Sequence, residues 1–371
     1  MQSPLGRSRG KLPPLFTGQP FFYPFLVKTR IVPISASSLR EACQILQGGD
    51  LVAFPTETVY GLGALGLRSD AVQKIFHAKG RPSTDPLILH LPSPDLNQAV
   101  THHWMAAPIP PFANELAKKF WPGPLTLVVP KGAKVPLEVT AGLGTVALRV
   151  PAHPVAEKLL QELGEPLAAP SANRFGRISP TDASAVLQEL DGKIPLILDG
   201  GPCPHGIEST VLSLLSDPPT ILRPGSITAE MISEITHTEV WLQSKQKDPK
   251  SGMPSPGMLE NHYAPQTPLY LCTAPIKSFA SPYQFILYQN CPTSPEAQVH
   301  LLCPDGKHST AAQNLYRVLR EADQAASSAI LIDPVPDSPW ALALRDRLHR
   351  ASAGTANWAN GQWNLRPRET T

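Results

Sequence analysis

Hydroxyl, cationic and imidazole side chains gather in one stretch of this sequence, residues 54–90, which reads FPTETVYGLGALGLRSDAVQKIFHAKGRPSTDPLILH. Thr56, Thr58 and Tyr60 follow a short apolar run, and Lys79 and Arg81 flank a glycine further along. These polar groups fall at the ends of expected helices and strands, where catalytic and binding side chains usually lie. The stretch is therefore the first candidate for a functional site.

The same stretch contains the elements that must hold these groups. Residues 51–54 are apolar and predict a strand that ends at Pro55. A helix is expected from Ser69, a good N-cap residue, to Gly80, because residues 71, 72, 75 and 76 form one apolar face. Residues 87–91 predict a second strand that includes His90.

Two common nucleotide motifs do not explain the site. Gly61, Gly63 and Gly66 have the spacing G-x-G-x-x-G, but six residues separate the strand from the first glycine, and the expected helix starts too late. No G-x-x-x-x-G-K-[ST] motif occurs, so a P-loop is excluded. If a nucleotide binds, irregular loops and basic side chains must hold it.

Length and composition indicate a globular protein of two domains. The chain has 371 residues, 42% of them hydrophobic, and a net charge of +2 that gives no indication of nucleic acid binding. No apolar run approaches the length of a membrane span. The odd number of scattered cysteines predicts reduced thiols and a cytoplasmic location, and turn residues explain Cys203 and His205 better than a metal site.

The first 28 residues are basic and rich in proline, with no acid before Glu41. This composition is typical either of an organelle transit peptide or of a disordered extension. The prolines would break an amphipathic helix, which favours the extension.

Helices and strands alternate along the rest of the chain. Strands are expected at residues 29–33, 125–129, 145–150, 167–169, 194–198, 269–272, 285–288, 299–302 and 329–332, with two more near Thr210 and Arg223. Helices are expected at residues 37–48, 113–120, 154–163, 310–322 and 339–351, with one more from about Asp182. Residues 236–266 are rich in lysine and proline and predict a linker. The tail from Asn357 is expected to be frayed.

Three regions have both a functional and a structural interpretation. Thr145 and Arg149 share one face of their strand, which is either a ligand floor or the solvated face of an edge strand. Residues 170–181 carry hydroxyls and arginines before a helix, which suits turns and caps but also an anion site. Arg223, beside a Pro-Gly turn, is expected to point outward by default.

Six motifs occur in a fixed order along the chain. They are Phe54-Pro-Thr-Glu-Thr-Val-Tyr-Gly-Leu-Gly, Lys79-Gly-Arg81-Pro, Pro122-Gly-Pro-Leu-Thr126, Pro170-Ser171-Ala-Asn173, Gly206-Ile-Glu-Ser209-Thr210 and Arg223-Pro-Gly. In this order they resemble the YrdC-like threonylcarbamoyl-AMP synthases. Ser255-Pro-Gly-Met258 and His262-Tyr263 resemble the linker of the longer, two-domain form.

The resemblance implies a fold and a reaction. The fold is α/β, a YrdC-like domain with a twisted mixed β-sheet flanked by helices, followed by a linker and a small Rossmann-like αβ domain. The domain ranges are 1–28 for the extension, 29–235 for the catalytic domain, 236–266 for the linker or lid, and 267–371 for the C-terminal domain. The reaction joins L-threonine, bicarbonate or CO2 and ATP into threonylcarbamoyl-AMP and pyrophosphate, for modification of tRNA to N6-threonylcarbamoyladenosine.

The resemblance also implies roles for particular residues. The two assigned to catalysis are Lys79 and Arg81. The set implied to hold threonine is Thr58, His90, Arg149, Ser171 and Ser209. The set implied to surround ATP is Arg81, Asp85, Thr145, Asn173, Ser179, Arg223 and Tyr263. Mg²⁺ is expected with ATP and no protein-bound metal is expected, while the implied partners are downstream threonylcarbamoyl-transferase proteins and RNA, with no membrane.

Three positions depart from the family pattern. Asp85 stands where relatives often carry Asn, Gly144 replaces a common Asp, and Leu259-Glu260-Asn261 replaces basic or aromatic linker residues. Two other functions compete with the synthase. One is a non-catalytic RNA-binding module of the same fold, and the other is a carbamoyl phosphate enzyme, whose relatives carry cysteine pairs that this chain lacks.

Overall fold

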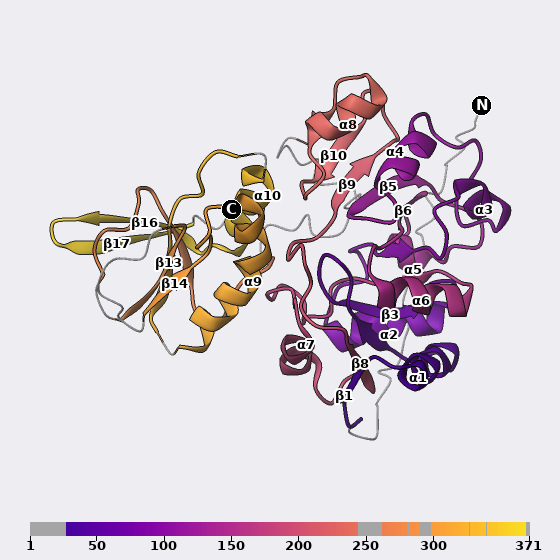
Figure 1. The fold of residues 1–371 in the computed structure, drawn as a ribbon, viewed down its shortest axis with the longest axis horizontal. Coiled ribbons are helices and arrows are strands. Elements are labelled where there is room, and N and C mark those ends of the chain that lie inside the picture. The colour runs from indigo at the N-terminus through magenta and orange to yellow at the C-terminus, as the bar shows by residue number, and fades with distance from the viewer. Residues whose placement is uncertain are drawn as a thin grey trace, which may run out of the picture.

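The computed structural model describes residues 27–243, 262–279, 282–289, 298–325, 327–338 and 340–368. Figure 1 shows two α/β units, which we call the N-terminal unit (residues 27–243) and the C-terminal unit (residues 269–368). Residues 262–268, which lead into the C-terminal unit, are called the returning segment. The motif at Ser255–Met258, the departures at Leu259, Glu260 and Asn261, and the first 26 residues lie outside the described residues.

The N-terminal unit is built on a mixed sheet. Among the residues described, it has eleven strands in the order β1-β8-β2-β3-β7-β4-β6-β5-β9-β10-β11. The strands are β1 Arg30–Pro33, β2 Val52–Phe54, β3 Gly61–Leu65, β4 Ile88–His90, β5 Leu125–Pro130, β6 Thr145–Arg149, β7 Leu167–Ala168, β8 Leu196–Asp199, β9 Thr210–Ser213, β10 Thr220–Arg223 and β11 Trp241–Leu242. The helices are α1 Ala36–Gln47, α2 Ser69–Lys79, α3 Leu96–Thr101, α4 Ala113–Phe120, α5 Leu137–Thr140, α6 Pro154–Leu163, α7 Ala183–Leu190 and α8 Ala229–Thr236.

Side-chain alternation divides the hydrophobic core between the two faces of this sheet. Val52 and Phe54 pack in a cluster with residues of α1 and α6, whereas Ala53, between them, packs in a second cluster with residues of α2 and α4. Helices therefore cover both faces, as expected for the mixed sheet.

The C-terminal unit is a second, smaller sheet with helices. In its described part the strand order is β14-β13-β15-β12-β16-β17. All neighbours pair in parallel except β16 and β17, which are antiparallel. Its elements are β12 Leu269–Cys272, β13 Tyr283–Leu287, β14 Val299–Leu301, α9 His308–Gln324, β15 Ala329–Ile332, α10 Ala341–Ala351, β16 Gly354–Ala359 and β17 Gln362–Pro367. This confirms the predicted small αβ domain.

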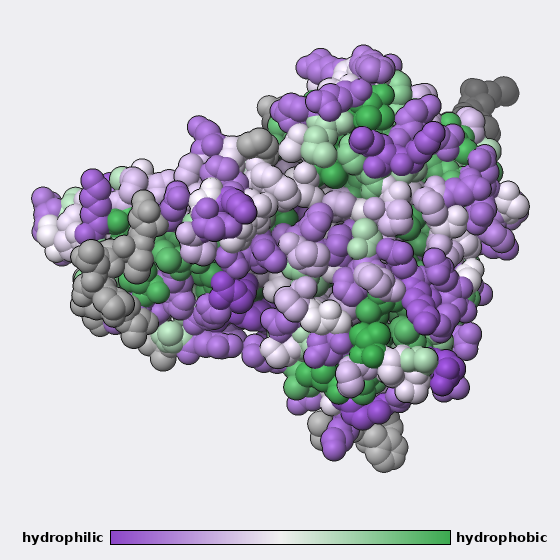
Figure 2. All heavy atoms as spheres, in the orientation of Figure 1, coloured by the Kyte–Doolittle hydropathy of each residue, from purple (hydrophilic) through white to green (hydrophobic). Residues whose placement is uncertain are grey.

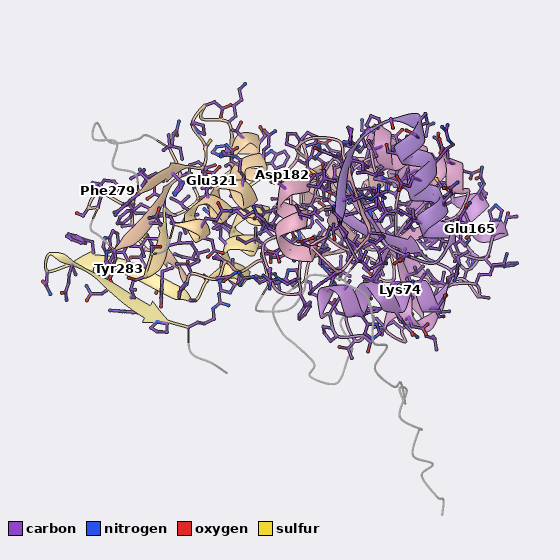
Figure 3. The ribbon with its side chains drawn as sticks, turned by 90° about the horizontal axis from the view of Figure 1, so that it is seen from below. Lys74, Glu165, Asp182, Phe279, Tyr283 and Glu321 are labelled. Atoms are coloured by element: carbon purple, nitrogen blue, oxygen red, sulfur yellow. The ribbon has the colours of Figure 1, made fainter. Side chains whose placement is uncertain are left out.

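The two units share hydrophobic core. Val59, Ile178 and Ile207 of the N-terminal unit belong to the same buried cluster as many residues of α9 and α10. Figure 1 shows α9 and α10 on the side of the C-terminal unit that faces the larger unit, while the β16–β17 hairpin points away. In Figure 3, Asp182, the N-cap of α7, lies beside the C-terminal unit, and Glu165 lies at the opposite end of the N-terminal unit.

The surface seen in Figure 2 is mainly hydrophilic, with hydrophobic residues in separate patches. Within the described ranges, no helix is long and apolar enough to cross a membrane.

Two details of the sequence-based prediction are wrong, and one strand, β3, was not predicted. The N-cap of α2 is Arg68 rather than Ser69, whose hydroxyl instead donates to Glu138. The glycine-rich residues 61–65 form β3, in which a Cβ on Gly63 would lie 2.7 Å from the ring of Phe54. The tail from Asn357 is not frayed, because Gly354–Ala359 and Gln362–Pro367 form a hairpin closed at Asn360 and Gly361, both with positive φ.

Candidate active site

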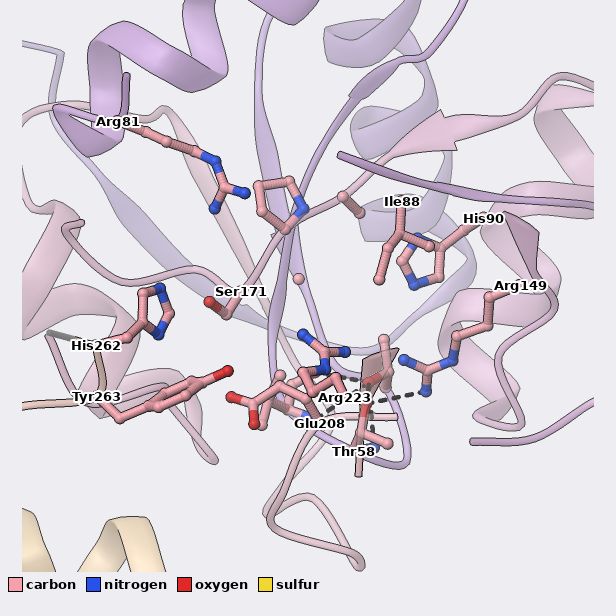
Figure 4. Close-up of a pocket in the computed structure, with 15 residues that line it drawn as sticks. Thr58, Arg81, Ile88, His90, Arg149, Ser171, Glu208, Arg223, His262 and Tyr263 are labelled. Carbon is pink, nitrogen blue, oxygen red and sulfur yellow. Dashed lines mark hydrogen bonds between the residues drawn. The ribbon is translucent and has the colours of Figure 1, made fainter. Parts of the chain in front are cut away.

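A pocket opens in the N-terminal unit where the ends of several strands meet the returning segment (Figure 4). Loops after β2 and β7 contribute to it, as do α2, β4, β6 and β10 or the residues next to them. The fifteen lining residues are Thr56, Thr58, Val59, Gly61, Arg81, Ile88, His90, Arg149, Ala169, Pro170, Ser171, Glu208, Arg223, His262 and Tyr263.

Arg149 forms a buried cationic centre on one side of the pocket. Its Nη2 donates to Thr58 Oγ1 at 2.9 Å and lies 2.7 Å from Glu57 Oε1 in an ion pair. The strand β6 that carries it lies between β4 and β5, so this face is not an edge. This arrangement supports the interpretation of the Arg149 face as a ligand floor.

His90 lies next to Arg149 because β4 and β6 run parallel with these two residues in register. Burial, together with the charge of Arg149, lowers the pKa of His90 to about 3. Its Nδ1 is buried without a hydrogen-bond partner among the described residues. At neutral pH the imidazole is therefore uncharged and adds hydrogen-bonding capacity to the pocket without adding positive charge.

Lys79 holds the 171–173 loop in place from behind the pocket. It lies at the end of α2, where Gly80 takes the left-handed conformation with φ 63°. Lys79 Nζ donates to Ser171 O at 2.6 Å and also to Asn173 O. Burial and the nearby Arg81 lower the pKa of Lys79 well below its usual value.

Arg81 is paired with the acid that departs from the family pattern. Its Nη2 lies 2.9 Å from Asp85 Oδ2 and donates to Pro86 O at 2.9 Å. Burial raises the pKa of Asp85, and Arg81 acts against that rise. The carboxylate thus offsets part of the positive charge that Arg81 presents to the pocket.

Arg223 turns inward, so the default expectation that it points outward is wrong. The side chain is 4% exposed, and its Nη2 donates to Ser209 O at 3.0 Å and Ser209 Oγ at 3.1 Å. Ser209 Oγ also lies 2.8 Å from Thr126 Oγ1. Because β9 and β10 pair antiparallel, they bring Ser209 and Arg223 together.

Glu208 is a buried carboxylate on the wall of the pocket. Ser179 Oγ donates to its Oε1 at 2.6 Å, and Arg347 Nε donates to its Oε2 at 2.8 Å. Although burial acts to raise the pKa of Glu208, the charges of Arg347 and Arg223 and the hydrogen bond from Ser179 lower it to about 2. Glu208 is therefore ionised at neutral pH.

The returning segment covers the pocket with Tyr263 and His262. Figure 4 shows Tyr263 and Glu208 pointing toward each other. Tyr263 is 1% exposed, its φ is 66°, and its hydroxyl has no hydrogen-bond partner in the part of the chain that the structure describes. The His262 and Tyr263 rings contact at nearly right angles, with centroids 4.1 Å apart.

Most of the residues singled out from the sequence meet here. The pocket lining includes Thr58, Arg81, His90, Arg149, Ser171, Arg223 and Tyr263. Buried behind it are Lys79, Asp85, Asn173, Ser179 and Ser209. Thr145 is different, because it is half-buried at the start of β6 and is not a lining residue.

The sequence interpretation missed Glu208 and His262 as site residues. Glu208 stands between Ile207 and Ser209 in a run of small, apolar and hydroxyl residues, and an acid in that setting is a signal of a paired, buried carboxylate.

Among the described residues, no group of three or more His, Cys, Asp or Glu side chains is placed to hold a metal ion.

Comparison with known proteins identifies the family. The family model of Sua5, YciO and YrdC proteins, described as telomere recombination, matches residues 44–225. The model of the C-terminal domain of threonylcarbamoyl-AMP synthase matches residues 227–353. The threonylcarbamoyl-AMP synthase of Bacillus subtilis is 41% identical over 331 residues, covering 85% of this chain and 93% of the relative.

A second relative has both a similar sequence and a similar structure. The threonylcarbamoyl-AMP synthase of Pyrococcus abyssi is 39% identical, with coverage of 85% of this chain and 94% of the relative. The crystal structure of P. abyssi Sua5 complexed with L-threonine matches with a TM-score of 0.78 and 36% identity, covering 90% of this chain and 99% of that one.

Fold and pocket together define a two-unit α/β enzyme with a cation-rich pocket beneath the returning segment. The chain belongs to the threonylcarbamoyl-AMP synthase family.

Proposed function

We propose that the pocket forms threonylcarbamoyl-AMP from L-threonine, bicarbonate or CO2 and ATP, with release of pyrophosphate. The observation that carries this assignment is the division of the pocket into two cationic centres. Arg149 lies beside Thr58 and the neutral His90 (Figure 4), whereas the charges of Arg81 and Arg223 interact with the Tyr263 hydroxyl. One centre suits an amino acid carboxylate and the other suits phosphates.

The first centre is assigned to threonine. Arg149 presents a fork of donors that matches a carboxylate, and Thr58 and Ser171 offer hydroxyl groups for a small polar substrate. Ser209 is buried behind the lining, so its assignment to threonine rests on the family resemblance alone. His90 accepts a hydrogen bond from the amine without adding a repelling charge. The crystal structure of P. abyssi Sua5 with L-threonine supports this choice of substrate.

The second centre is assigned to ATP. Arg81 and Arg223 face the pocket and neutralise phosphates, while Lys79 fixes the loop that carries Ser171 and Asn173. Asp85 and Ser179 support this centre through Arg81 and Glu208. Thr145 is assigned to the nucleotide on the family resemblance alone, and Tyr263 covers the site as a lid.

In the reaction, the threonine nitrogen attacks the carbon of CO2, loses a proton and becomes a carbamate. A carbamate oxygen then attacks the α-phosphorus of ATP as the bond to pyrophosphate breaks. The protein needs no covalent intermediate, because its task is to position two anions and neutralise charge. His262 and Tyr263, which are both buried over the pocket, exclude water from the mixed anhydride product.

Mg²⁺ is proposed to arrive with ATP and to neutralise charge on its phosphates when bound. The buried carboxylates at the pocket, Glu57, Asp85 and Glu208, are each paired with an arginine. Because these carboxylates are paired with arginines, Mg²⁺ would be held mainly by the phosphate oxygens of ATP. Arg81 and Arg223 would contact other phosphate oxygens.

The remaining parts of the proposal concern the cell and the whole chain. The product is passed to threonylcarbamoyl-transferase proteins that act on tRNA, and the location is cytoplasmic. Residues 29–235 form the catalytic domain, residues 236–266 the lid and residues 267–371 the C-terminal domain. The four described cysteines are buried free thiols, which supports a reducing compartment.

The test is pyrophosphate release by the purified full chain, with each of ATP, L-threonine and bicarbonate omitted in turn. Release that requires all three, with a threonylcarbamoyl adenylate detected by mass, is the expected result. Correctly folded protein that binds RNA but releases no pyrophosphate would instead identify a non-catalytic RNA-binding module.

A further inference from the structure

Two side chains of the C-terminal unit reach the wall of the pocket although neither lines it. Tyr316 of α9 is fully buried, and Arg347 of α10 is 1% exposed. The Tyr316 hydroxyl lies 3.0 Å and 2.9 Å from the two oxygens of Glu208, and Arg347 Nε donates to Oε2 at 2.8 Å. Glu208 is thus held by partners from both units, because Ser179 of the N-terminal unit also donates to it.

The same two side chains hold the ring of Tyr263. The rings of Tyr263 and Tyr316 are stacked, with centroids 5.8 Å apart and planes 26° apart. The guanidinium carbon of Arg347 lies 5.4 Å from the centre of the Tyr263 ring, in cation–π range. Tyr263 therefore sits against the C-terminal unit while its hydroxyl is buried at the pocket.

Domain docking alone does not account for these contacts. The units already share an apolar cluster, and a second, half-buried arginine, Arg320 of α9, joins them by pairing with Glu189 at 3.3 Å and donating to Ile178 O at 2.6 Å. Burying an additional ion pair gives little net stability compared with apolar packing. Arg347 and Tyr316 differ from Arg320 because both contact Glu208 and Tyr263, which line the pocket.

We propose that Arg347 and Tyr316 are positioning residues for adenylation, which make nucleotide binding depend on docking of the C-terminal unit. They fix Glu208, whose neighbour Ser209 contacts Arg223, and they fix the Tyr263 ring over the pocket. This inference rests on the proposed function. It gives the C-terminal unit a part in the reaction, although none of the fifteen lining residues belongs to it.

The test compares Arg347→Met with Arg320→Met in the full chain. Both remove an arginine that pairs with a glutamate across the interface, but only the first removes a contact with the pocket wall. We expect Arg347→Met to lower kcat/KM for ATP by about 20-fold, the effect of losing a charged buried hydrogen bond. The Kd of L-threonine, measured by calorimetry without ATP, should change less than about threefold, and Arg320→Met should change neither quantity more than about threefold.

Two further variants separate positioning from a structural loss. Tyr316→Phe keeps the ring against Tyr263 but removes the hydroxyl, so it tests the Glu208 contact even if Arg347→Met does not fold. Arg347→Lys keeps the charge without the planar fork and should recover part of the activity. On a Tyr263→Ala background, Arg347→Met should have a smaller effect than in the original chain, because part of its effect acts through that ring.

The inference would be overturned if Arg347→Met and Arg320→Met lowered kcat/KM for ATP equally. Strictly additive effects of Arg347→Met and Tyr263→Ala on kcat/KM would also overturn it, and both results would leave the synthase activity in place. Failure of the unaltered protein to release pyrophosphate would instead remove the proposed function. Unchanged ATP kinetics in both Tyr316→Phe and Arg347→Met would also overturn the inference.

Discussion

At the scale of single residues, the pocket is a set of buried charges in pairs. Arg149 is paired with Glu57, Arg81 with Asp85, and Glu208 with Arg347. Removing one member of such a pair leaves the other charge buried and unpaired, which is usually costly. Each substitution must therefore be compared with a control that separates the loss of stability from the loss of binding.

Arg149→Ala should raise KM for L-threonine by about 30-fold, in line with the loss of a buried charged hydrogen bond. KM for ATP should change by less than about threefold, because Arg149 lies at the other cationic centre. Steady-state kinetics with each substrate varied in turn give both values. Since Glu57 is left unpaired, the double variant with Glu57→Gln serves as the stability control, and equal effects on both substrates contradict the assignment.

Asp85→Asn should tighten ATP binding by about threefold to tenfold, because it removes a negative charge that offsets Arg81. Arg81 keeps its hydrogen bond to Pro86 O and so stays in place. Calorimetric titration with ATP measures the change, and Asp337→Asn, which alters a surface carboxylate paired with Arg345, is the matched control. Weaker binding in Asp85→Asn would show that Asp85 mainly orients Arg81.

The contribution of Glu208 to the stability of the fold depends on pH. Its pKa is lowered from 4.5 to about 2 in the folded protein, so its charge stabilises the fold above about pH 4.5 and this contribution is lost as pH falls toward 2. Arg347, Tyr316, Arg223 and Tyr263 are the other titratable groups around it. The difference in free energy of unfolding between the original chain and Glu208→Gln should therefore shrink by about 3 kcal/mol from pH 5 to pH 2. Urea unfolding at several pH values measures it, and a constant difference contradicts the pairing.

At the scale of helices and strands, a glycine decides how closely the two units approach. Gly206 has φ +71°, and a Cβ there would lie 2.4 Å from Gln313 Cα in α9. The loop before β9 thus packs directly on the backbone of α9. This loop also carries Glu208, so the close approach brings the carboxylate within reach of Tyr316.

Gly206→Ala should destabilise the protein by about 3 kcal/mol, because it combines a strained φ with a backbone clash. Gly142→Ala is the matched control and should cost only about 1 kcal/mol. Gly142 also has a positive φ, of +80°, but a Cβ added there would meet none of the described atoms within 4 Å. Urea unfolding of both variants measures the difference. Equal losses would mean that the clash with α9 is relieved at little cost.

The sequence predicted elements well where local signals agree, as in α4 and α6. Pro154 begins α6, and Gly164 ends it in the left-handed conformation, so both bounds are encoded locally. The sequence interpretation missed β3. Gly63 is required there because the ring of Phe54, on another strand, leaves no room for a side chain. The β16–β17 hairpin carried a local signal in Asn360-Gly361, and its pair Trp358–Trp363, with centroids 5.5 Å apart, adds a cross-strand contact.

The family resemblance led to the correct position of Arg149, His90 and Ser171 in one pocket, and the alternation along its strand also pointed to Arg149. The inward turn of Arg223 was not predictable, because it depends on Ser209 beside a neighbouring strand. The roles of Arg347 and Tyr316 were out of reach, since they lie 139 and 108 positions from Glu208 and no local pattern links them.

At the scale of the whole molecule, the two units are joined by a buried interface. Val59, Ile178 and Ile207 lie in the same apolar cluster as α9 and α10, and Arg320 adds a polar contact beside it. Separating the units would expose this cluster to water, which costs about 25 cal/mol for each Å² of apolar surface. The pocket therefore depends on contacts that extend well beyond its own lining.

The full chain should unfold in a single transition despite its two sheets, because the shared cluster couples them. Unfolding curves in urea, followed by far-UV circular dichroism and by tryptophan fluorescence, are expected to coincide. Two separated transitions would show that each unit keeps its structure without the other.

The residues before and after Tyr263 in the sequence form backbone hydrogen bonds to different units. His262 N donates to Arg350 O of α10 at 3.2 Å, and Ala264 N donates to Gly176 O of the N-terminal unit at 2.9 Å. If the units move apart, one of these bonds has to break first. If the His262 bond remains, the Tyr263 ring moves with α10 and the pocket is uncovered. If the Ala264 bond remains, the ring keeps its place over the pocket. The order in which these two backbone hydrogen bonds break would therefore decide whether the pocket is uncovered or stays closed when the units separate.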